Sequence, residues 1–130
     1  MLIQMELSRI LIADAQDYQL IELREVDGER RLPIVIGFYE ATAIERRLKG
    51  LLNRRPLTHD LLANVIEQLG ARLDRIVIND LRNDTYFAQL LIARNGDVAA
   101  VDSRPSDAIA LGIARNVPIY VAESVLDASE

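Results

Sequence analysis

The sequence predicts one compact α+β domain over residues 1–130, with a mixed, largely antiparallel sheet and three main helices. Three observations favour this class. A length of 130 residues is that of one ordinary domain, and 50% hydrophobic residues suffice for a sizeable core. Tight turn pairs separate apolar stretches of strand length. The helical patterns form separate blocks, which favours α+β over a doubly wound parallel sheet.

Strands are expected where Ile, Leu and Val are frequent and partly alternate, over 5–13, 18–25, 31–37, 72–81, 85–94, 98–102 and from Val117 on. The pair Asp27-Gly28 is a strong hairpin signal because both residues can take positive φ. Asn83-Asp84 and Asn95-Gly96 are further turn pairs and predict an antiparallel meander. A short terminal turn is expected near 123–127.

Helices are predicted from apolar residues at helical spacing, over about 38–49, from Leu57 or Thr58 to 69, and over about 104–115. Gly50 and Gly70 suit the position that follows a helix end. In the second helix one apolar stripe is formed by Leu61, Leu62, Val65, Ile66 and Leu69.

Composition restricts the function classes. The absence of cysteine excludes disulfides, thiolate zinc sites and cysteine nucleophiles. No apolar run approaches the roughly 18 residues of a membrane helix, and the first residues lack a signal-peptide pattern, so we expect a cytoplasmic protein without a membrane partner. With a net charge of −5 and only short basic clusters at 46–49 and 54–55, any nucleic-acid contact should be weak and local.

Two stretches repeat one arrangement at a predicted helix start. "RRPLTHDLL" (54–62) and "VDSRPSDAIAL" (101–111) both place Arg-Pro ahead of a hydroxyl residue and an aspartate. Proline is favourable in a first helical turn, and an aspartate there complements the helix dipole. Side-chain caps are expected from Thr58, Ser103 or Ser106, and dipole complementation from Asp60 and Asp107.

Helix capping does not explain Arg55 and Arg104, because an arginine before a helix start faces the positive end of the dipole. Each can pair with an aspartate, or it can combine with free N–H groups to hold an anion such as phosphate. Both interpretations stay open. Two such starts could face a single cleft.

Several titratable residues are candidates for chemistry. His59, the only histidine, is either a hydrogen-bonding residue of a first turn or a general acid or base. Glu40 follows a strand end and either complements a helix dipole or serves a site. Oxygen ligands for Mg²⁺ or Mn²⁺ are offered by Asp60, Asp80, Asp102 and Asp107, although 20 acidic residues make chance clusters common.

Three segments carry a resemblance to a known family. "LPIVIGFYEATAIERRLKG", "RPLTHDLL" and "VDSRPSDAIALGIARNVPIYV" together resemble the bifunctional nuclease domain family, in family order and over nearly the whole chain. The resemblance implies a compact α+β fold that tends to form oligomers. It also implies nuclease activity, since plant members are described as degrading both RNA and DNA.

Two functions of different class are consistent with these residues. The first is a metal-assisted nuclease of low specificity, acting on RNA, DNA or both. Its phosphate would be held by Arg55, Thr58, Arg104 and Ser106, its Mg²⁺ or Mn²⁺ by Asp60, Asp102 and Asp107, and its catalytic groups would be His59, Asp60 and Glu40. The alternative is a non-catalytic homo-oligomeric module, dimeric or larger, that binds a protein or ligand through the strands at 5–13 and 85–94.

Overall fold

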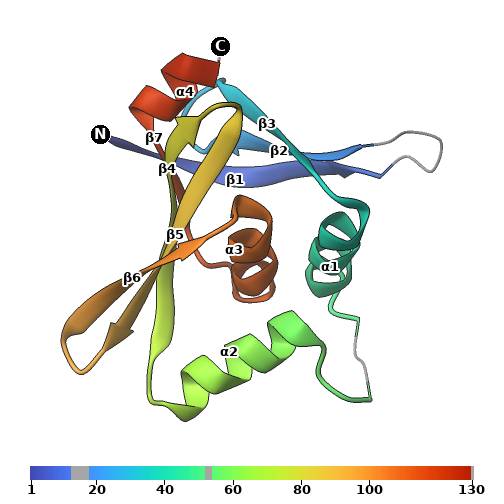
Figure 1. Ribbon diagram of the computed structural model, residues 1–130, viewed down its shortest axis with the longest axis vertical. Helices are drawn as coiled ribbons and strands as arrows, with labels where there is room; N and C mark the ends of the chain where they lie inside the picture. The colour runs from blue at the N-terminus through green and yellow to red at the C-terminus, as the bar shows by residue number, and fades with distance from the viewer. Residues whose placement is uncertain (13–17, 52–53, 130) are drawn as a thin grey trace.

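A seven-stranded mixed sheet organises residues 1–12, 18–51 and 54–129, which the computed structural model describes (Figure 1). The strand order is β3-β2-β1-β7-β4-β5-β6. The strands are β1 Leu2–Leu11, β2 Gln19–Glu25, β3 Arg31–Ile36, β4 Arg72–Arg82, β5 Thr85–Arg94, β6 Asp97–Ser103 and β7 Ile119–Ala122.

The short strand β7 joins the two antiparallel groups that the sequence predicts. It runs antiparallel to β1, with Leu2 opposite Ala122, and parallel to β4, with Ile76 opposite Ile119. The other neighbouring pairs are antiparallel, so the predicted mixed, largely antiparallel sheet is confirmed.

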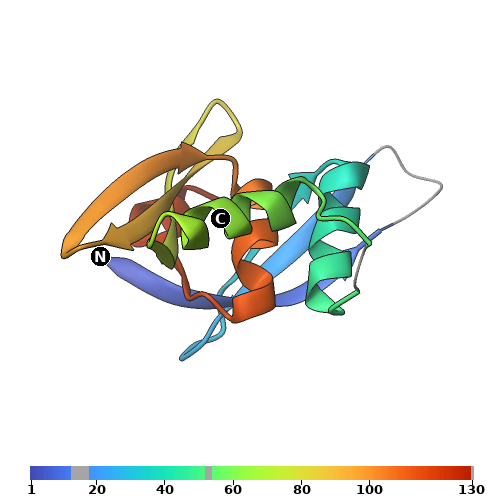
Figure 2. The same ribbon diagram turned by 90° about the horizontal axis from the view of Figure 1, so that it is seen from below.

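The helices α1 Phe38–Leu48, α2 Thr58–Gln68 and α3 Pro105–Gly112 occupy the angle between the two halves of the bent sheet (Figures 1 and 2). A 3₁₀ turn, η1 Ile113–Arg115, follows α3, and the last helix, α4 Glu123–Ser129, lies apart from the other three against β4 and β7. The central helix α3 packs against α1, α2, β4 and β5, and Ala108 and Ile109 are fully buried in it. Among the helices described, none combines the length and apolarity needed to cross a bilayer.

The element boundaries agree with the predictions except in a few places. Strand β1 begins at Leu2, and its expected end at residue 13 lies outside the described residues. The third helix ends at Gly112 and tightens into η1, where Asn116 takes a left-handed φ of 54°. The expected terminal turn is the helix α4, because burial of Val125 and Leu126 fixes it to the fold.

The turn residues behave in two ways. Asn83, Asp84, Asn95 and Gly96 adopt positive φ as their type predicts. Asp27-Gly28 does link two paired strands, but neither residue adopts positive φ. The reason is a longer loop, closed by the hydrogen bond from the Glu25 N–H to the carbonyl of Arg30.

The apolar stripe of α2 is largely exposed. A stripe of this kind usually faces a core, but only Ile66 is buried, at 9% exposure. The exposed fractions of Leu61, Val65 and Leu69 are 55%, 44% and 58%. The helix packs mainly on α3 and the beginning of β4, which covers one narrow line of its surface.

Candidate functional site

An open hollow of about 900 Å³ lies where the starts of α1, α2 and α3 face β5 and β6. We call it the main hollow. Its polar end is lined by Glu40, Thr58, His59, Asp102, Arg104 and Asp107. Its apolar end is lined by Leu62, Ile66, Leu90, Ile92 and Val101. Residues from both Arg-Pro helix starts therefore share one cleft.

The start of α2 presents Thr58 and His59 to this hollow. Thr58 is the first helical residue and Leu57 occupies the cap position, without a side-chain cap. The prediction that Thr58 caps the helix is therefore wrong. Asp60 supplies the cap instead, since its Oδ2 accepts from the Leu57 N–H at 3.1 Å. Pro56 precedes the cap and lies outside the helix.

The start of α3 presents Arg104 and Asp107. Pro105 is the first helical residue, as predicted, but neither Ser103 nor Ser106 caps the helix, so those two predictions are wrong. The Ser103 hydroxyl donates instead to the carbonyl of Arg104. Ser106 is buried at 5% exposure, because the first turn of α3 is already inside the fold.

Arg104 pairs with carboxylates from two helices. Its Nε donates to Asp107 Oδ2 at 2.9 Å, and its Nη1 donates to Glu40 Oε2 at 3.1 Å. The Arg104 side chain nevertheless remains 64% exposed. The pairing interpretation is thus confirmed for Arg104, and the outer part of its guanidinium stays open to solvent.

His59 completes a chain of contacts across the polar end. Its Nε2 lies 3.0 Å from Asp107 Oδ1, and its side chain is 19% exposed. Asp107 thus uses one oxygen for His59 and the other for Arg104. The sequence of contacts His59–Asp107–Arg104–Glu40 links the first turns of α2, α3 and α1.

Two of these four linked residues, Asp107 and Arg104, have shifted pKa values. Partial burial of Asp107 acts to raise its pKa, but the hydrogen bonds and charges of Arg104 and His59 outweigh it, and the pKa lies below its usual value. The hydrogen bond and charge of Asp107, with a lesser contribution from Glu40, raise the pKa of Arg104 although burial acts to lower it. Asp107 is therefore a fixed anion at neutral pH.

Asp60 lies outside the main hollow. It forms an ion pair with Arg47 of α1, whose side chain is only 12% exposed. Arg47 also donates to the carbonyls of Ala110 and, at 3.0 Å, Leu111 near the end of α3. This arginine therefore ties α1, α2 and α3 together, and Asp60 serves that tie and the α2 cap.

Two other predicted residues also lie apart from the main hollow. Arg55 is exposed, does not line it, and forms no ion pair with another described residue. Ser106 lines an adjoining hollow of about 330 Å³, together with Tyr86, Glu40 and Arg104. We call it the second hollow. The expected convergence of Arg55 and Arg104 is not observed, because Arg55 precedes the α2 cap on an exposed loop.

The carboxylates expected to bind a metal are not gathered. Asp60 faces Arg47, Asp107 uses both oxygens in the site, and Asp102 lines the main hollow from β6. Asp80 pairs with Arg82 on β4. Within the described ranges no three His, Asp or Glu side chains are arranged to hold a metal ion. As arranged, these residues do not fit Mg²⁺ or Mn²⁺.

Sequence reasoning missed two residues. Tyr39 lines the main hollow beside Glu40 and is 83% exposed; the signal was an aromatic pair directly after a strand end. Arg47 was assigned to a short basic cluster for local nucleic-acid contact, yet it points inside the fold. The sequence feature that indicates an inward-pointing Arg47 is its position, one turn after the buried Ile44 on α1.

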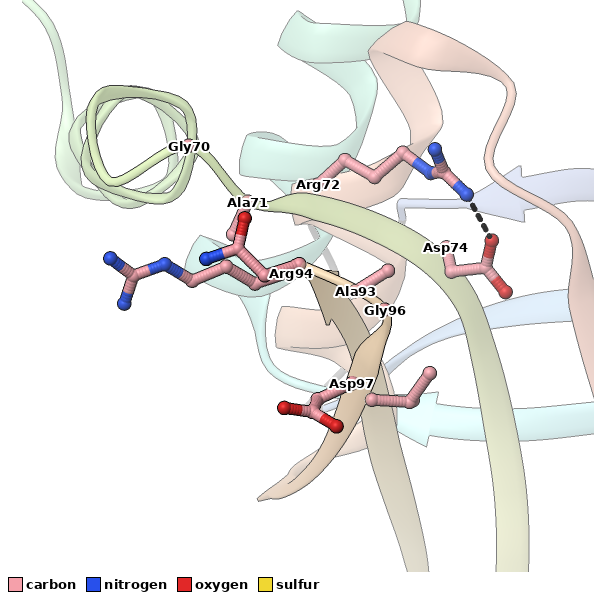
Figure 3. A pocket seen from close by; sticks show the side chains of 10 residues that line it. Gly70, Ala71, Arg72, Asp74, Ala93, Arg94, Gly96 and Asp97 are labelled. Carbon is pink, nitrogen blue, oxygen red and sulfur yellow. Dashed lines mark hydrogen bonds and ion pairs between the residues drawn. The ribbon is translucent and has the colours of Figure 1, made fainter.

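A further hollow, of about 490 Å³, opens between the end of α2 and the β5–β6 turn (Figure 3). It contains none of the predicted site residues. Figure 3 shows Arg72 turned to Asp74, at 3.4 Å, while Arg94 extends away from that pair. The two arginines thus do not converge on one position.

A profile of the bifunctional nuclease domain matches residues 21–130. The chain belongs to this family. The resemblance drawn from the three motifs is confirmed. The match includes the four linked residues of the bifunctional nuclease domain's polar hollow, Glu40, His59, Arg104 and Asp107.

Similar proteins occur in bacteria and plants. The Uncharacterized protein MT1877 of Mycobacterium tuberculosis is 44% identical over 117 residues, 90% of this chain and 70% of that protein. Bifunctional nuclease 2 of Oryza sativa subsp. japonica is 28% identical over 118 residues, 88% of this chain and 36% of the rice protein. Bifunctional nuclease 1 of Arabidopsis thaliana is 24% identical over 114 residues, 85% of this chain and 35% of its own length. The chain thus spans about a third of these plant relatives.

Proposed function

We propose that this domain hydrolyses phosphodiester bonds of RNA or DNA, with low specificity, at the polar end of the main hollow. The observation that carries the proposal is the contact chain from His59 through Asp107 to Arg104 in an open cleft. A base oriented by a carboxylate beside an exposed guanidinium suits attack of water on a phosphate. Family membership and the names of the plant relatives support the same reaction class.

Arg104 binds the substrate phosphate in this proposal. A guanidinium carries five N–H donors, and the contacts to Asp107 and Glu40 involve two of its nitrogens. The remaining donors and the first-turn N–H groups of α3 favour an anion. The two carboxylates compete with the substrate for Arg104, so binding of a single phosphate should be weak.

His59 is the proton acceptor. When its Nε2–H donates to Asp107, the lone pair on Nδ1 is free to take a proton from the attacking water. Asp107 holds the ring and stabilises the imidazolium that forms. As water adds to phosphorus, the P–O bond to one sugar oxygen breaks, that oxygen takes a proton from solvent water, and the imidazolium releases its proton to solvent. Glu40 serves as a positioning residue through Arg104, and Thr58 is a further hydrogen-bond donor at the same end.

The prediction of Mg²⁺ or Mn²⁺ stays a separate proposal. Either ion would screen developing charge and lower the pKa of a bound water. The carboxylates as arranged do not fit such an ion, so no step above uses one. A titration with each metal chloride, against a chelator-treated sample, measures whether the cleavage rate depends on it.

The test is cleavage of end-labelled single-stranded RNA and DNA by purified protein. His59→Ala should lower kcat by about 10²-fold or more, as expected when a general base is removed. Arg24→Ala is the matched control, since Arg24 forms an exposed pair with Glu6. Equal rates for all three proteins would identify a contaminating nuclease and contradict the proposal.

The second candidate function is a homo-oligomeric binding module, and one observation favours it. The exposed stripe of α2 is accompanied by exposed Val98 and Val101 on the edge strand β6. Exposed apolar area of this kind is typical of interaction surfaces. The shared surface expected on the strands at 5–13 and 85–94 stays a prediction, and both β1 and β5 already have neighbouring strands on their two edges. The proposed interface is therefore α2 with β6.

A further inference from the structure

An exposed aromatic ring stands at the polar end of the main hollow. Tyr39 is 83% exposed and lines the hollow next to Glu40. Phe38 holds the ring in an edge-to-face contact, with centroids 5.7 Å apart and planes at 84°. An exposed ring that is restrained beside a phosphate site is a platform on which a nucleobase can stack.

The second hollow continues the cleft on the other side of Arg104. Glu40 and Arg104 line both hollows, so their ion pair lies between them. The second hollow measures about 330 Å³, and Asp84 and Tyr86 are among the residues that line it. Both volumes fall within the range of about 300–1,000 Å³ that is usual for ligand sites. A nucleotide on each side would place the linking phosphate over Arg104.

Charge determines which form of nucleic acid fits this arrangement. Duplex recognition relies on many phosphate contacts from a basic surface, whereas this chain has a net charge of −5. Arg104 is the one arginine or lysine among the residues that line the two hollows. Binding must then come from the bases, and only unpaired bases expose their faces for stacking.

We infer that Tyr39 is a base-stacking residue that makes the site selective for single-stranded nucleic acid, with the strand crossing Arg104 from the main hollow into the second. This inference rests on the proposed function and specifies its substrate. Stacking acts on bound substrate and transition state alike. Loss of the ring should therefore raise KM and leave kcat nearly unchanged.

The test compares Tyr39→Ala and Tyr39→Phe with the wild-type domain. Binding of a labelled oligothymidine and of a labelled duplex is measured by fluorescence anisotropy, with His59→Ala added to every protein so that the probe is not cleaved. The protein that retains Tyr39 should prefer the single strand, Tyr39→Ala should weaken that binding about tenfold or more, and Tyr39→Phe should retain it. Tyr120→Ala is the matched control, because Tyr120 alternates with buried Ile119 and Val121 and points to the other face of β7.

The outcomes separate this inference from the proposed hydrolysis. Equal affinity for duplex and single strand, unchanged binding by Tyr39→Ala, or no binding of oligothymidine at all would each overturn the inference. Cleavage that needs His59 but ignores Tyr39 would leave the hydrolysis standing alone. Binding that depends on Tyr39 in a protein without any cleavage would support the inference and refute the hydrolysis.

Discussion

His59 Nε2 lies 3.0 Å from Asp107 Oδ1, a contact between side chains 48 positions apart in sequence. It joins the first turn of α2 to the first turn of α3. Because Asp107 also binds Arg104, one carboxylate sets the position of both the proposed base and the proposed phosphate ligand. Changes at this residue should therefore affect the fold and the site together.

Asp107→Asn tests the charge of this carboxylate. The pKa of Asp107 is lower in the folded state than its ordinary value of about 3.9, so its stabilising effect is present above that value and is lost as pH falls through the folded pKa. The wild type should lose stability below about pH 4. The variant should have a lower free energy of unfolding at neutral pH, and that free energy should fall less steeply as the pH is lowered.

Urea midpoints measured across this pH range check the prediction. Asp74→Asn is the control, since Asp74 pairs with the exposed Arg72. An Asp107→Asn curve parallel to that of the wild type would show that Asp107 does not contribute through its charge.

Gly37→Ala tests the position of Glu40. A methyl group at residue 37 would overlap the Glu40 carboxylate. Replacing glycine by alanine at this cap position should lower the free energy of unfolding by no more than about 1 kcal/mol. The carboxylate should move away from Arg104 and leave more of the guanidinium for phosphate. Inorganic phosphate should then inhibit cleavage more strongly. Glu40→Gln should shift inhibition in the same direction, and unchanged inhibition in both variants would refute competition by Glu40.

Arg47→Met tests the tie between the three helices. The substitution leaves Asp60 and the carbonyls of Ala110 and Leu111 without their donor at a site that is mostly buried. We expect a loss of about 2–4 kcal/mol in the free energy of unfolding. Arg24→Met, at the exposed pair with Glu6, should cost under about 1 kcal/mol. Similar losses in both variants would show that the tie has no special role.

Leu61→Glu tests the proposed interface. Leu61 is 55% exposed, so a charge there should not disturb the fold. Light scattering should give a multiple of 14.6 kDa for the wild type and a smaller mass for the variant. Val35→Glu, on a residue that is 65% exposed on β3, should leave the wild-type mass unchanged. A wild-type protein of monomer mass would contradict the oligomer.

Local chemistry accounts for what the sequence could predict. The turn residues Asn83-Asp84 and Asn95-Gly96 adopt the positive φ that their side chains tolerate, so the meander was recognisable. Helical spacing located α1 and α2 to within a residue or two. The two Arg-Pro helix starts and the carboxylate after a strand end indicated His59, Arg104, Asp107 and Glu40, which meet at the polar end of the main hollow.

Contacts between residues far apart in the sequence account for the features that the sequence could not predict. The position of β7 between β1 and β4 depends on contacts between opposite ends of the chain, which no local pattern encodes. Asp60 and Asp107 are each the third residue of a helix that begins at or just after an Arg-Pro pair, yet Asp60 turns to Arg47 and Asp107 to His59. A partner on another helix determines the direction in which each aspartate side chain points. The exposed stripe of α2 shows likewise that periodicity identifies an apolar face without saying what covers it.

The most direct test of a shared hydrolytic site is a double-mutant cycle on His59→Ala and Arg104→Ala, read as kcat/KM for a single-stranded oligonucleotide. Residues that act on one phosphate as a unit lose activity non-additively. We expect each single variant to lose most of the cleavage, and the double variant to be scarcely less active than the less active of the two single variants. Cleavage unchanged in all three variants, or losses that simply multiply, would contradict it.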